Sequence, residues 1–252
     1  MSAKRCLQRL LLLVLGLLAV RPLPAAEPVS AGTVFVVGGV GGLDPLQASA
    51  PWALPHAGVP HRIEVFPWTH GMLRPLRDLQ DVRYLLKQAD RLAEAVLEEQ
   101  ARHPGRPIYL LGHSAGAALI LAASEKLPPA SVERMILLAA AVSPTYDLRP
   151  ALRATRREVI AFSSTYDRLC LDWCTSLFGT ADRVYGPAAG LDGFREPDDL
   201  DEEGRGAYRR LVQVPWHLGM IWQGTDGLHN GACMPIFLTH RIAPWLLPKD
   251  GY

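Results

Sequence analysis

The sequence has few cysteines, no excess of charge of either sign, and no repeats. Its 252 residues include four cysteines, and none has the C-x-x-C spacing typical of structural zinc sites. Lys and Arg number 26 and Asp and Glu 25, so the net charge of +1 gives no reason to expect a nucleic-acid partner. With 49% hydrophobic and 20% charged residues, the chain has the composition of one globular domain with a substantial core.

The first 30 residues have the three parts of a secretory signal. They are the basic residues Lys4, Arg5 and Arg9, the apolar run over 10–20, and the small-residue region over 22–26. The run is too short for an ordinary membrane span. We therefore expect a signal peptide over 1–26, cleaved between 26 and 31, and a single exported domain over 32–252, periplasmic or secreted. The alternative is an uncleaved N-terminal anchor that tethers the domain to a membrane.

Export changes what the cysteines can do, because disulfides persist in an oxidising compartment. Cys6 leaves with the signal, so the mature chain keeps Cys170, Cys174 and Cys233. On one helical turn, Cys170 and Cys174 would place their Cβ atoms about 5–6 Å apart, against roughly 3.8 Å in a disulfide. A bridge from Cys233 to Cys170 or Cys174 is therefore the more plausible pairing. The alternative is three free thiols.

Short apolar runs alternate with helical patterns, which is typical of a mostly parallel sheet with helices on both faces. Strands are expected at Thr33–Val37, Arg62–Phe66, Ile108–Leu111, Met135–Val142, Val159–Ser163 and Leu211–Val214. Apolar residues spaced by three and four predict a helix over 78–101, and further helices are expected near 169–178 and near 234–247. The stretch over 181–210, rich in Gly and acidic residues, is expected to be a surface loop.

One pentapeptide carries a chemical signal: Gly112-His113-Ser114-Ala115-Gly116. An apolar strand precedes it and an alanine-rich helix follows, which is the setting of a nucleophile elbow. In such an elbow a sharp turn presents a serine hydroxyl at the end of a sheet, beside a helix N-terminus that stabilises negative charge. Ser114 is therefore the candidate nucleophile.

A serine needs a base and a group that orients the base. Asp167 follows the penultimate predicted strand, and His229 lies in a glycine-rich loop after the last one. The order Ser114, Asp167, His229 is the order expected for this elbow. The rival acids are Asp147, after the preceding strand, and Asp172, one helical turn beyond Asp167, and the rival histidine is His217.

The elbow, the order of these three residues and the strand pattern resemble the α/β-hydrolase superfamily in its small, lidless form. The resemblance covers about residues 33–247 and implies a three-layer α/β sandwich. About 15 residues separate the fourth and fifth expected strands, which leaves no room there for a large cap domain. The resemblance also implies an oxyanion loop after the first strand. Many members have His-Gly there, and this chain has Gly38-Gly39. The implied oxyanion donors are the backbone N–H groups of Val40 and Ala115.

The resemblance implies acyl transfer to water without a metal or cofactor. Tryptophans that follow strands suggest an apolar acyl site, with Trp68, Trp173, Trp216 and His217 as candidate substrate contacts. The expected activity is hydrolysis of small to medium apolar carboxylic esters. A lipase, thioesterase, acyltransferase or peptidase would use the same three residues, and a non-catalytic binding protein can keep the fold. The sequence leaves the oligomeric state open.

Overall fold

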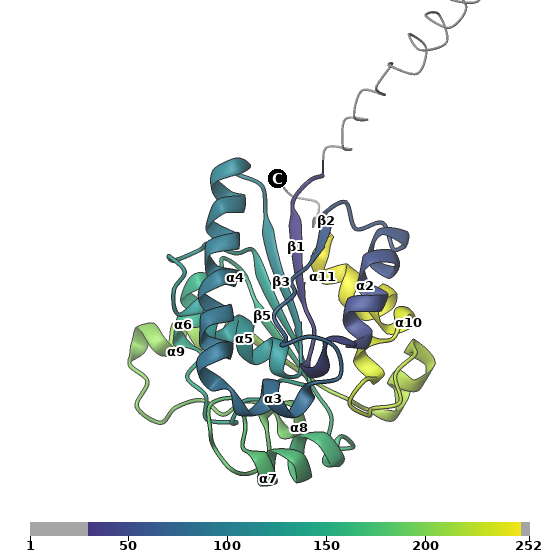
Figure 1. Ribbon diagram of the computed structural model, residues 1–252. Coiled ribbons are helices and arrows are strands. Elements are labelled where there is room, and N and C mark those ends of the chain that lie inside the picture. The colour runs from purple at the N-terminus through teal and green to yellow at the C-terminus, as the bar shows by residue number, and fades with distance from the viewer. Residues whose placement is uncertain (1–29, 248–252) are drawn as a thin grey trace, which may run out of the picture. The chain divides into compact units, whose positions relative to one another are not determined.

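The computed structural model describes residues 30–247, apart from the side chains of Leu169, Trp173, Cys174, Leu177 and Phe178. The expected signal peptide therefore lies outside the described residues. The described chain forms one six-stranded sheet in the order β2-β1-β3-β4-β5-β6, and every neighbouring pair is parallel (Figure 1). The prediction of an α/β sandwich is confirmed.

The strands are β1 Thr33–Val37, β2 Arg62–Val65, β3 Ile108–His113, β4 Arg134–Leu138, β5 Val159–Ser163 and β6 Leu211–Pro215. The strand order reverses between β1 and β3, so the connections that leave these two strands cover opposite faces of the sheet. A crevice forms at such a switch point, at the carboxyl ends of the strands. The segment after β1 and the serine after β3 both lie at this point.

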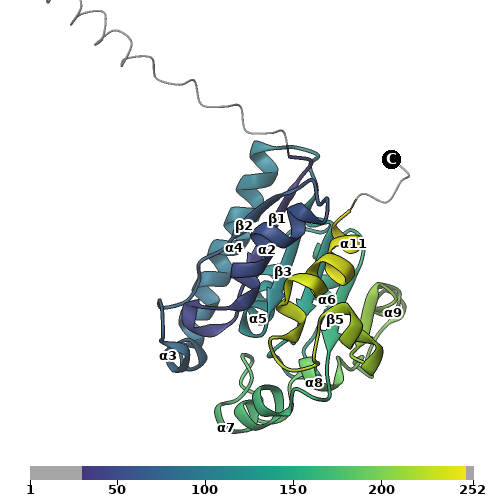
Figure 2. The same ribbon diagram turned by 90° about the vertical axis from the view of Figure 1, so that its right-hand side faces the viewer.

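Helices cover both faces of the sheet (Figures 1 and 2). One face is covered chiefly by α4 Val82–Arg102, α5 Ala115–Ser124, α6 Arg149–Ala154 and α9 Glu202–Tyr208. The other is covered by α2 Pro45–His56, α10 Pro235–Phe237, the π-helical turn η5 Leu238–Ile242 and α11 Ala243–Leu246. Among the described residues no large cap domain is inserted into this arrangement.

The strands bury alternate side chains in two separate cores, as the period-two geometry of a strand requires. In β1, Phe35 and Val37 pack toward α4 and α5, whereas Val34 and Val36 pack toward α2 and η5. The five residues of β1 are buried, and so are the six of β3. Burial on both faces explains why these strands are continuous apolar runs in the sequence.

Several predicted boundaries were wrong for identifiable reasons. The expected helix over 78–101 is two helices, α3 Pro75–Gln80 and α4, because Asp81 takes a non-helical conformation and caps α4 by accepting a hydrogen bond from the N–H of Tyr84. Strand β4 ends at Leu138 rather than Val142, since Ala139 has a positive φ of 49° and leads the chain out of the sheet.

Two other segments differ from expectation. The stretch over 181–210 is only partly a loop, because α8 Ala189–Asp192 and α9 bury apolar side chains against the sheet layers. The C-terminal helix consists of α10, η5 and α11 in succession, and Pro244 lies in the first turn of α11. Among the described residues, no helix is both long enough and apolar enough to cross a bilayer.

Candidate active site

Ser114 lies in a strained turn between β3 and α5. Its φ of 54° and ψ of −123° fall outside the ordinary regions for a non-glycine residue. The turn is fixed by close packing, because a Cβ on Gly116 would lie 2.2 Å from the carbonyl oxygen of Val37. A Cβ on Gly112 would lie 2.9 Å from the backbone of Ala117. Neither glycine can be replaced by a larger residue without a shift of neighbouring backbone. The two close contacts lie on either side of Ser114 and hold it in the turn.

The structure brings His229 and Asp167 to this serine. Nε2 of His229 lies 3.0 Å from Oγ of Ser114, and Nδ1 lies 2.5 Å from Oδ2 of Asp167. The Asp167 side chain is 3% exposed and that of His229 is 19% exposed, so the histidine is reachable and its acid is not. A second contact joins the loop that carries Asp167 to the loop that carries His229, since the hydroxyl of Ser164 donates to the carbonyl oxygen of Gly227 at 2.5 Å.

The rival residues lie elsewhere. Asp147 forms an exposed ion pair with Arg149 at 2.9 Å, and this guanidinium offsets the effect of partial burial and lowers the pKa of the Asp147 carboxyl. His217 is exposed at the start of η3 Leu218–Gln223 and does not line the recess beside His229. Neither side chain is in the hydrogen-bonded chain that runs from Ser114 to Asp167.

The oxyanion loop, Gly38–Gly42, lies against the serine. A Cβ on Gly39 would be 3.3 Å from Cβ of Ser114. Val40 opens the short helix η1 Val40–Gly42, and Ala115 opens α5. The N–H groups of first helical residues have no acceptor within their own helix, so both are available to a ligand. The geometry is compatible with the donor pair expected from sequence.

Three buried side chains fix the oxyanion loop. Asp44 accepts a hydrogen bond from the N–H of Gly39 at 2.7 Å, and Asp78 accepts one from the N–H of Gly41 at 2.8 Å. The indole N–H of Trp68 donates to the carbonyl oxygen of Gly38 at 2.7 Å. Trp68 is 1% exposed. Its expected role as a substrate contact is therefore wrong, because the ring packs inside the protein behind the loop.

Asp78 is part of a network that the sequence did not predict. Its side chain is fully buried, and Oδ1 accepts hydrogen bonds from both the backbone N–H and the Nδ1–H of His70, each at 2.8 Å. The ring of His70 stacks on Tyr84 with 3.7 Å between centroids. This network joins the segment after β2 to the oxyanion loop. A capping aspartate would have been the ordinary interpretation of Asp78 from sequence.

His113, beside the serine in the elbow, contacts two other segments of the site. Nδ1 lies 2.6 Å from Oδ2 of Asp44, and Nε2 lies 2.9 Å from the carbonyl oxygen of His229. Both partners are acceptors, so both ring nitrogens must carry hydrogen and the ring is an imidazolium. Burial alone would lower the pKa of His113, but the adjacent Cys233 and Asp44 raise it well above its usual value.

The expected disulfide does not form. Cys233 is a free thiol, fully buried beside His113 and Asp44, and burial raises its pKa. Cys170 instead lies beside Asp167 and His229. The prediction of a bond from Cys233 to Cys170 or Cys174 is therefore wrong. Cys233 lies beneath the elbow, next to the imidazolium of His113 and the carboxylate of Asp44.

These two cysteines also belong to the groups that resemble metal sites. Potential ligand atoms lie within 4.8 Å of one another in Asp44, His113 and Cys233, and in Asp167, Cys170 and His229. In the first group both nitrogens of His113 donate hydrogen bonds, and in the second the nitrogens of His229 face Ser114 and Asp167. Both arrangements fit hydrogen-bonded networks better than metal coordination, which needs a free ring lone pair.

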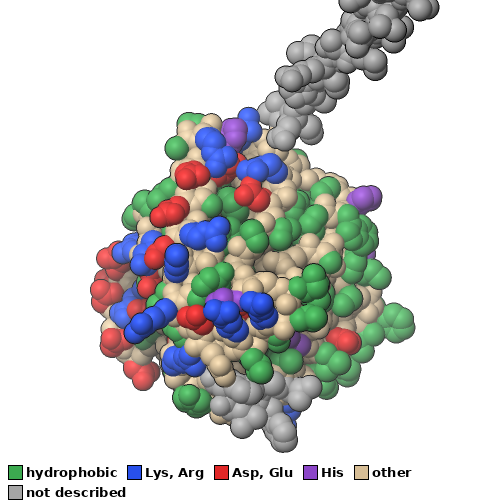
Figure 3. Space-filling model, in the orientation of Figure 1, with side chains coloured by type: hydrophobic (Ala, Val, Ile, Leu, Met, Phe, Trp, Pro, Cys, Tyr) green, Lys and Arg blue, Asp and Glu red, His purple; other side chains and the backbone are tan. Residues whose placement is uncertain are grey.

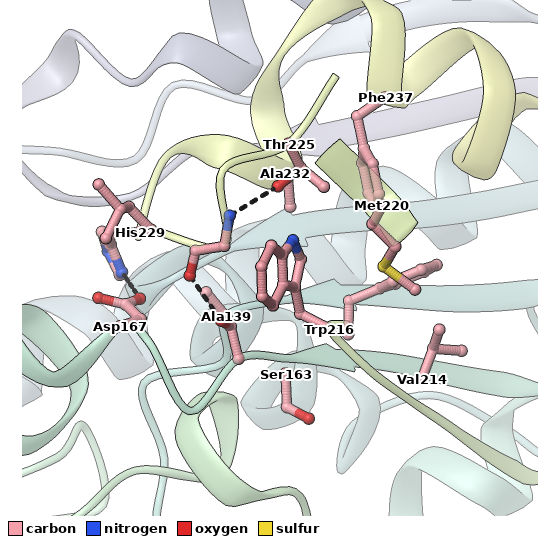
Figure 4. Close-up of a pocket in the computed structure, with 14 residues that line it drawn as sticks. Ala139, Ser163, Asp167, Val214, Trp216, Met220, Thr225, His229, Ala232 and Phe237 are labelled. Carbon is pink, nitrogen blue, oxygen red and sulfur yellow. Dashed lines mark hydrogen bonds and ion pairs between the residues drawn. The ribbon is translucent and has the colours of Figure 1, made fainter. Parts of the chain in front are cut away.

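A small recess lies beside Asp167 and His229 (Figure 4). The indole of Trp216 separates these two residues from Met220 and Phe237. The recess has a volume of about 30 Å³. Ligand pockets commonly measure roughly 300–1,000 Å³. Of the expected substrate contacts, Trp216 lines the recess, and the side chain of Trp173 lies outside the described residues.

Sheet order and elbow geometry are those of the α/β-hydrolase fold. Residues 76–171 match the family model of the S33 serine aminopeptidases, a segment that contains the elbow and Asp167 but ends before His229. This match covers less than half of the chain and supports its resemblance to the α/β-hydrolase superfamily. No curated protein matches the chain.

Solved structures similar to this chain include three hydrolases. A lidless α/β serine hydrolase from Xanthomonas campestris is 14% identical, with 90% of this chain and 88% of that one covered and a TM-score of 0.44. Trichoderma reesei cutinase, solved with a phosphonate inhibitor, is 14% identical over 87% and 77%, with a TM-score of 0.42. A sugar hydrolase from Lactococcus lactis is 11% identical over 88% and 90%, with a TM-score of 0.48. Such similarity extends to the fold alone.

Proposed function

We propose that the protein is an exported serine hydrolase that cleaves carboxylic esters through an acyl-enzyme intermediate. The observation that carries this proposal is the chain of two hydrogen bonds, 3.0 Å from His229 to Ser114 and 2.5 Å from His229 to Asp167. Together they give a hydroxyl, a base and a group that orients the base, all on connections at the carboxyl end of the sheet.

In the proposed mechanism His229 takes the proton of Ser114 while Oγ attacks the acyl carbonyl carbon. Asp167 accepts the hydrogen bond from Nδ1–H, which leaves the Nε2 lone pair directed at the serine, and it stabilises the imidazolium that forms. The N–H groups of Val40 and Ala115 bind the developing oxyanion. Donors of this kind contribute about 3–4 kcal/mol to the acyl-transfer step.

The second half of the reaction uses the same residues in reverse. The imidazolium of His229 returns its proton to the leaving alcohol, which departs. A water molecule then loses a proton to His229 and attacks the acyl carbon. The bond between the acyl carbon and Oγ breaks, His229 returns the proton to Oγ of Ser114, and the carboxylic acid leaves. Export rests on the basic, apolar and small-residue regions of 1–26, and the ester class rests on the apolar surroundings of the site.

A fluorophosphonate probe tests the proposal. We expect the folded protein to be labelled, labelling to be lost in Ser114→Ala, and labelling to be strongly reduced in His229→Ala. Hydrolysis of p-nitrophenyl esters from acetate to octanoate should fall by at least about a thousandfold in both variants. Folded protein that neither reacts with the probe nor cleaves any ester of the series would exclude the proposal.

Asp147→Asn is the matched control for Asp167→Asn. Both substitutions remove one carboxylate charge with little change of shape. We expect only Asp167→Asn to lower kcat, because Asp147 pairs with Arg149 at the surface. Mass spectrometry of the N-terminus of the exported protein tests the signal peptide, with cleavage expected between residues 26 and 31.

A further inference from the structure

A group of exposed apolar side chains lies beside the histidine loop, Gly224–Asn230. We call it the apolar face: Leu218, Ile221, Trp222, Leu228, Met234 and Ile236. Trp222 is 91% exposed and Leu218 is 66% exposed. Ile236 of α10 packs close to Gly224, the residue that directly follows η3. Leu228 directly precedes His229, and the face therefore reaches the mouth of the candidate active site.

The chain that forms this face has very few charges. Over residues 211–247 the only Asp, Glu, Lys or Arg residues are Asp226 and Arg241, of opposite sign. The adjacent helix α2 has none, and it exposes Trp52. In Figure 3 charged side chains gather over α4, and the part of the molecule over α2 and α10 is largely hydrophobic or uncharged. Single exposed apolar residues are ordinary, but contiguous apolar surface marks a binding site.

We propose that the apolar face binds the surface of an uncharged or zwitterionic lipid aggregate, which presents its ester groups to Ser114. This inference rests on the proposed function and names its substrate class. The near absence of charge matches a surface without net charge, and it offers an anionic membrane little electrostatic attraction. Exposed Trp and Leu side chains are the types that insert at a lipid–water interface.

The position of the face favours a lipid surface over a protein partner. A protein seated on Leu228 and Trp222 would restrict access to His229, whereas a lipid surface delivers substrate to the same place. The recess beside Asp167 and His229 has a volume of only about 30 Å³, so a long acyl chain would extend beyond it along the surface or into the lipid.

The test measures adsorption separately from catalysis. The exported protein carrying Ser114→Ala is mixed with phosphatidylcholine vesicles, and bound protein is recovered by flotation at low and high salt. We expect binding that changes less than about twofold with salt, and a reduction of at least about tenfold in Ile221→Ser/Trp222→Ser. Leu86→Ser, which alters an exposed leucine on α4, is the matched control and should bind like the parent. Any part of residues 1–29 that stays on the exported protein is the same in every variant.

Each outcome decides one of the two ideas. Absence of vesicle binding, or binding that the double substitution leaves unchanged, overturns the lipid-surface proposal. Binding lost at high salt also overturns it, since charges would then carry the attraction. If light scattering instead shows a dimer that the double substitution dissociates, a second copy covers the face. Fluorophosphonate labelling of Ile221→Ser/Trp222→Ser, without Ser114→Ala, should match wild type. Failure of labelling in wild type itself would overturn the proposed function and leave the adsorption result to be judged independently.

Discussion

Nδ1 of His113 lies 2.6 Å from a carboxylate oxygen of Asp44, and the two side chains are 1% and 5% exposed. Asp44 also accepts the N–H of Gly39 in the oxyanion loop and the N–H of Leu46 at the start of α2. His113 donates in turn to the carbonyl oxygen of His229. One buried ion pair therefore connects the oxyanion loop, the elbow and the histidine loop.

This pair predicts a loss of stability as the pH rises. The pKa of His113 is raised in the folded state, so its contribution is complete below about pH 6.5, the unfolded value, and declines as pH rises toward the folded pKa. The slope is at most about 1.4 kcal/mol per pH unit. Burial lowers the pKa of His61, so its effect on the free energy of unfolding lies below about pH 6.5, the unfolded value, and does not interfere with this measurement. Urea unfolding between pH 6.5 and 8.5 measures the decline.

The variant Asp44→Asn provides the comparison for that measurement. It removes the anion beside His113 while keeping a side chain of similar shape. We expect it to be less stable at pH 6.5 by about 3–5 kcal/mol, as when a buried ion pair is broken, and to show a flatter pH dependence. A wild-type free energy of unfolding that stays constant or rises between pH 6.5 and 8.5 would contradict the assignment of an imidazolium.

Asp78→Asn should lower kcat more than it changes KM. The carboxylate of Asp78 now accepts hydrogen bonds from Gly41 and His70. An asparagine would turn its NH2 group toward one of these donors, and we expect the resulting repulsion to displace Gly41 and the oxyanion loop. Loss of one oxyanion donor costs about a hundredfold or more in kcat, and a displaced donor should cost roughly tenfold. Steady-state kinetics on a soluble ester measure it. Asp90→Asn, which breaks only an exposed pair with Lys126, is the control. A rise in KM at constant kcat would indicate a role in substrate binding instead.

Trp68→Phe should weaken both folding and catalysis. Phenylalanine keeps an aromatic ring but leaves the buried carbonyl oxygen of Gly38 without its donor, a loss of about 1–3 kcal/mol. Thermal unfolding and ester hydrolysis measured on the same preparation should both decline. Trp52→Phe changes an exposed tryptophan on α2 and should leave both unchanged. Equal behaviour of the two variants would mean that the bond to Gly38 does not hold the loop.

The parts of the fold that the sequence predicted depend on local patterns. Strands buried on both faces are continuous apolar runs, so β1, β3 and β5 were located closely. Helix α2 was missed because it contains Pro51 and Pro55 and has no polar stripe. The break between α3 and α4 was missed because the apolar periodicity continues past Asp81, and the sequence pattern therefore gives no sign that the helix ends there.

The site shows the same division. The elbow, Asp167 and His229 follow from a motif and from chain order, and the structure brings all three together. The supporting residues could not be predicted in this way. Asp44, Asp78 and Trp68 contact the oxyanion loop only in the folded chain, and no spacing in the sequence indicates these contacts. Whether Cys233 forms a disulfide also depends on which side chains lie beside it in the fold. The number and spacing of the cysteines do not indicate this, and they led to the wrong prediction.

Gly116→Ala tests whether the elbow depends on the contact between α5 and β1. The added Cβ would lie 2.2 Å from the carbonyl oxygen of Val37 and 2.4 Å from that of Gly38, and both atoms belong to backbone that leads into the oxyanion loop. Relief requires the helix or the loop to move. Overpacking against side chains typically costs about 1–3 kcal/mol, and we expect at least the upper end of this range because backbone must shift. Fluorophosphonate labelling of the protein that does fold should fall sharply.

The matched control is Gly206→Ala in α9. There the new Cβ has only the end of Arg209 within 4 Å, at 3.5 Å. Alanine is the better helix former by up to about 1 kcal/mol, so stability should stay constant or rise slightly and labelling should not change. A Gly116→Ala protein as stable and as reactive as Gly206→Ala would show that the loop can shift freely. The close approach of Val37 to the elbow would then have no part in positioning Ser114.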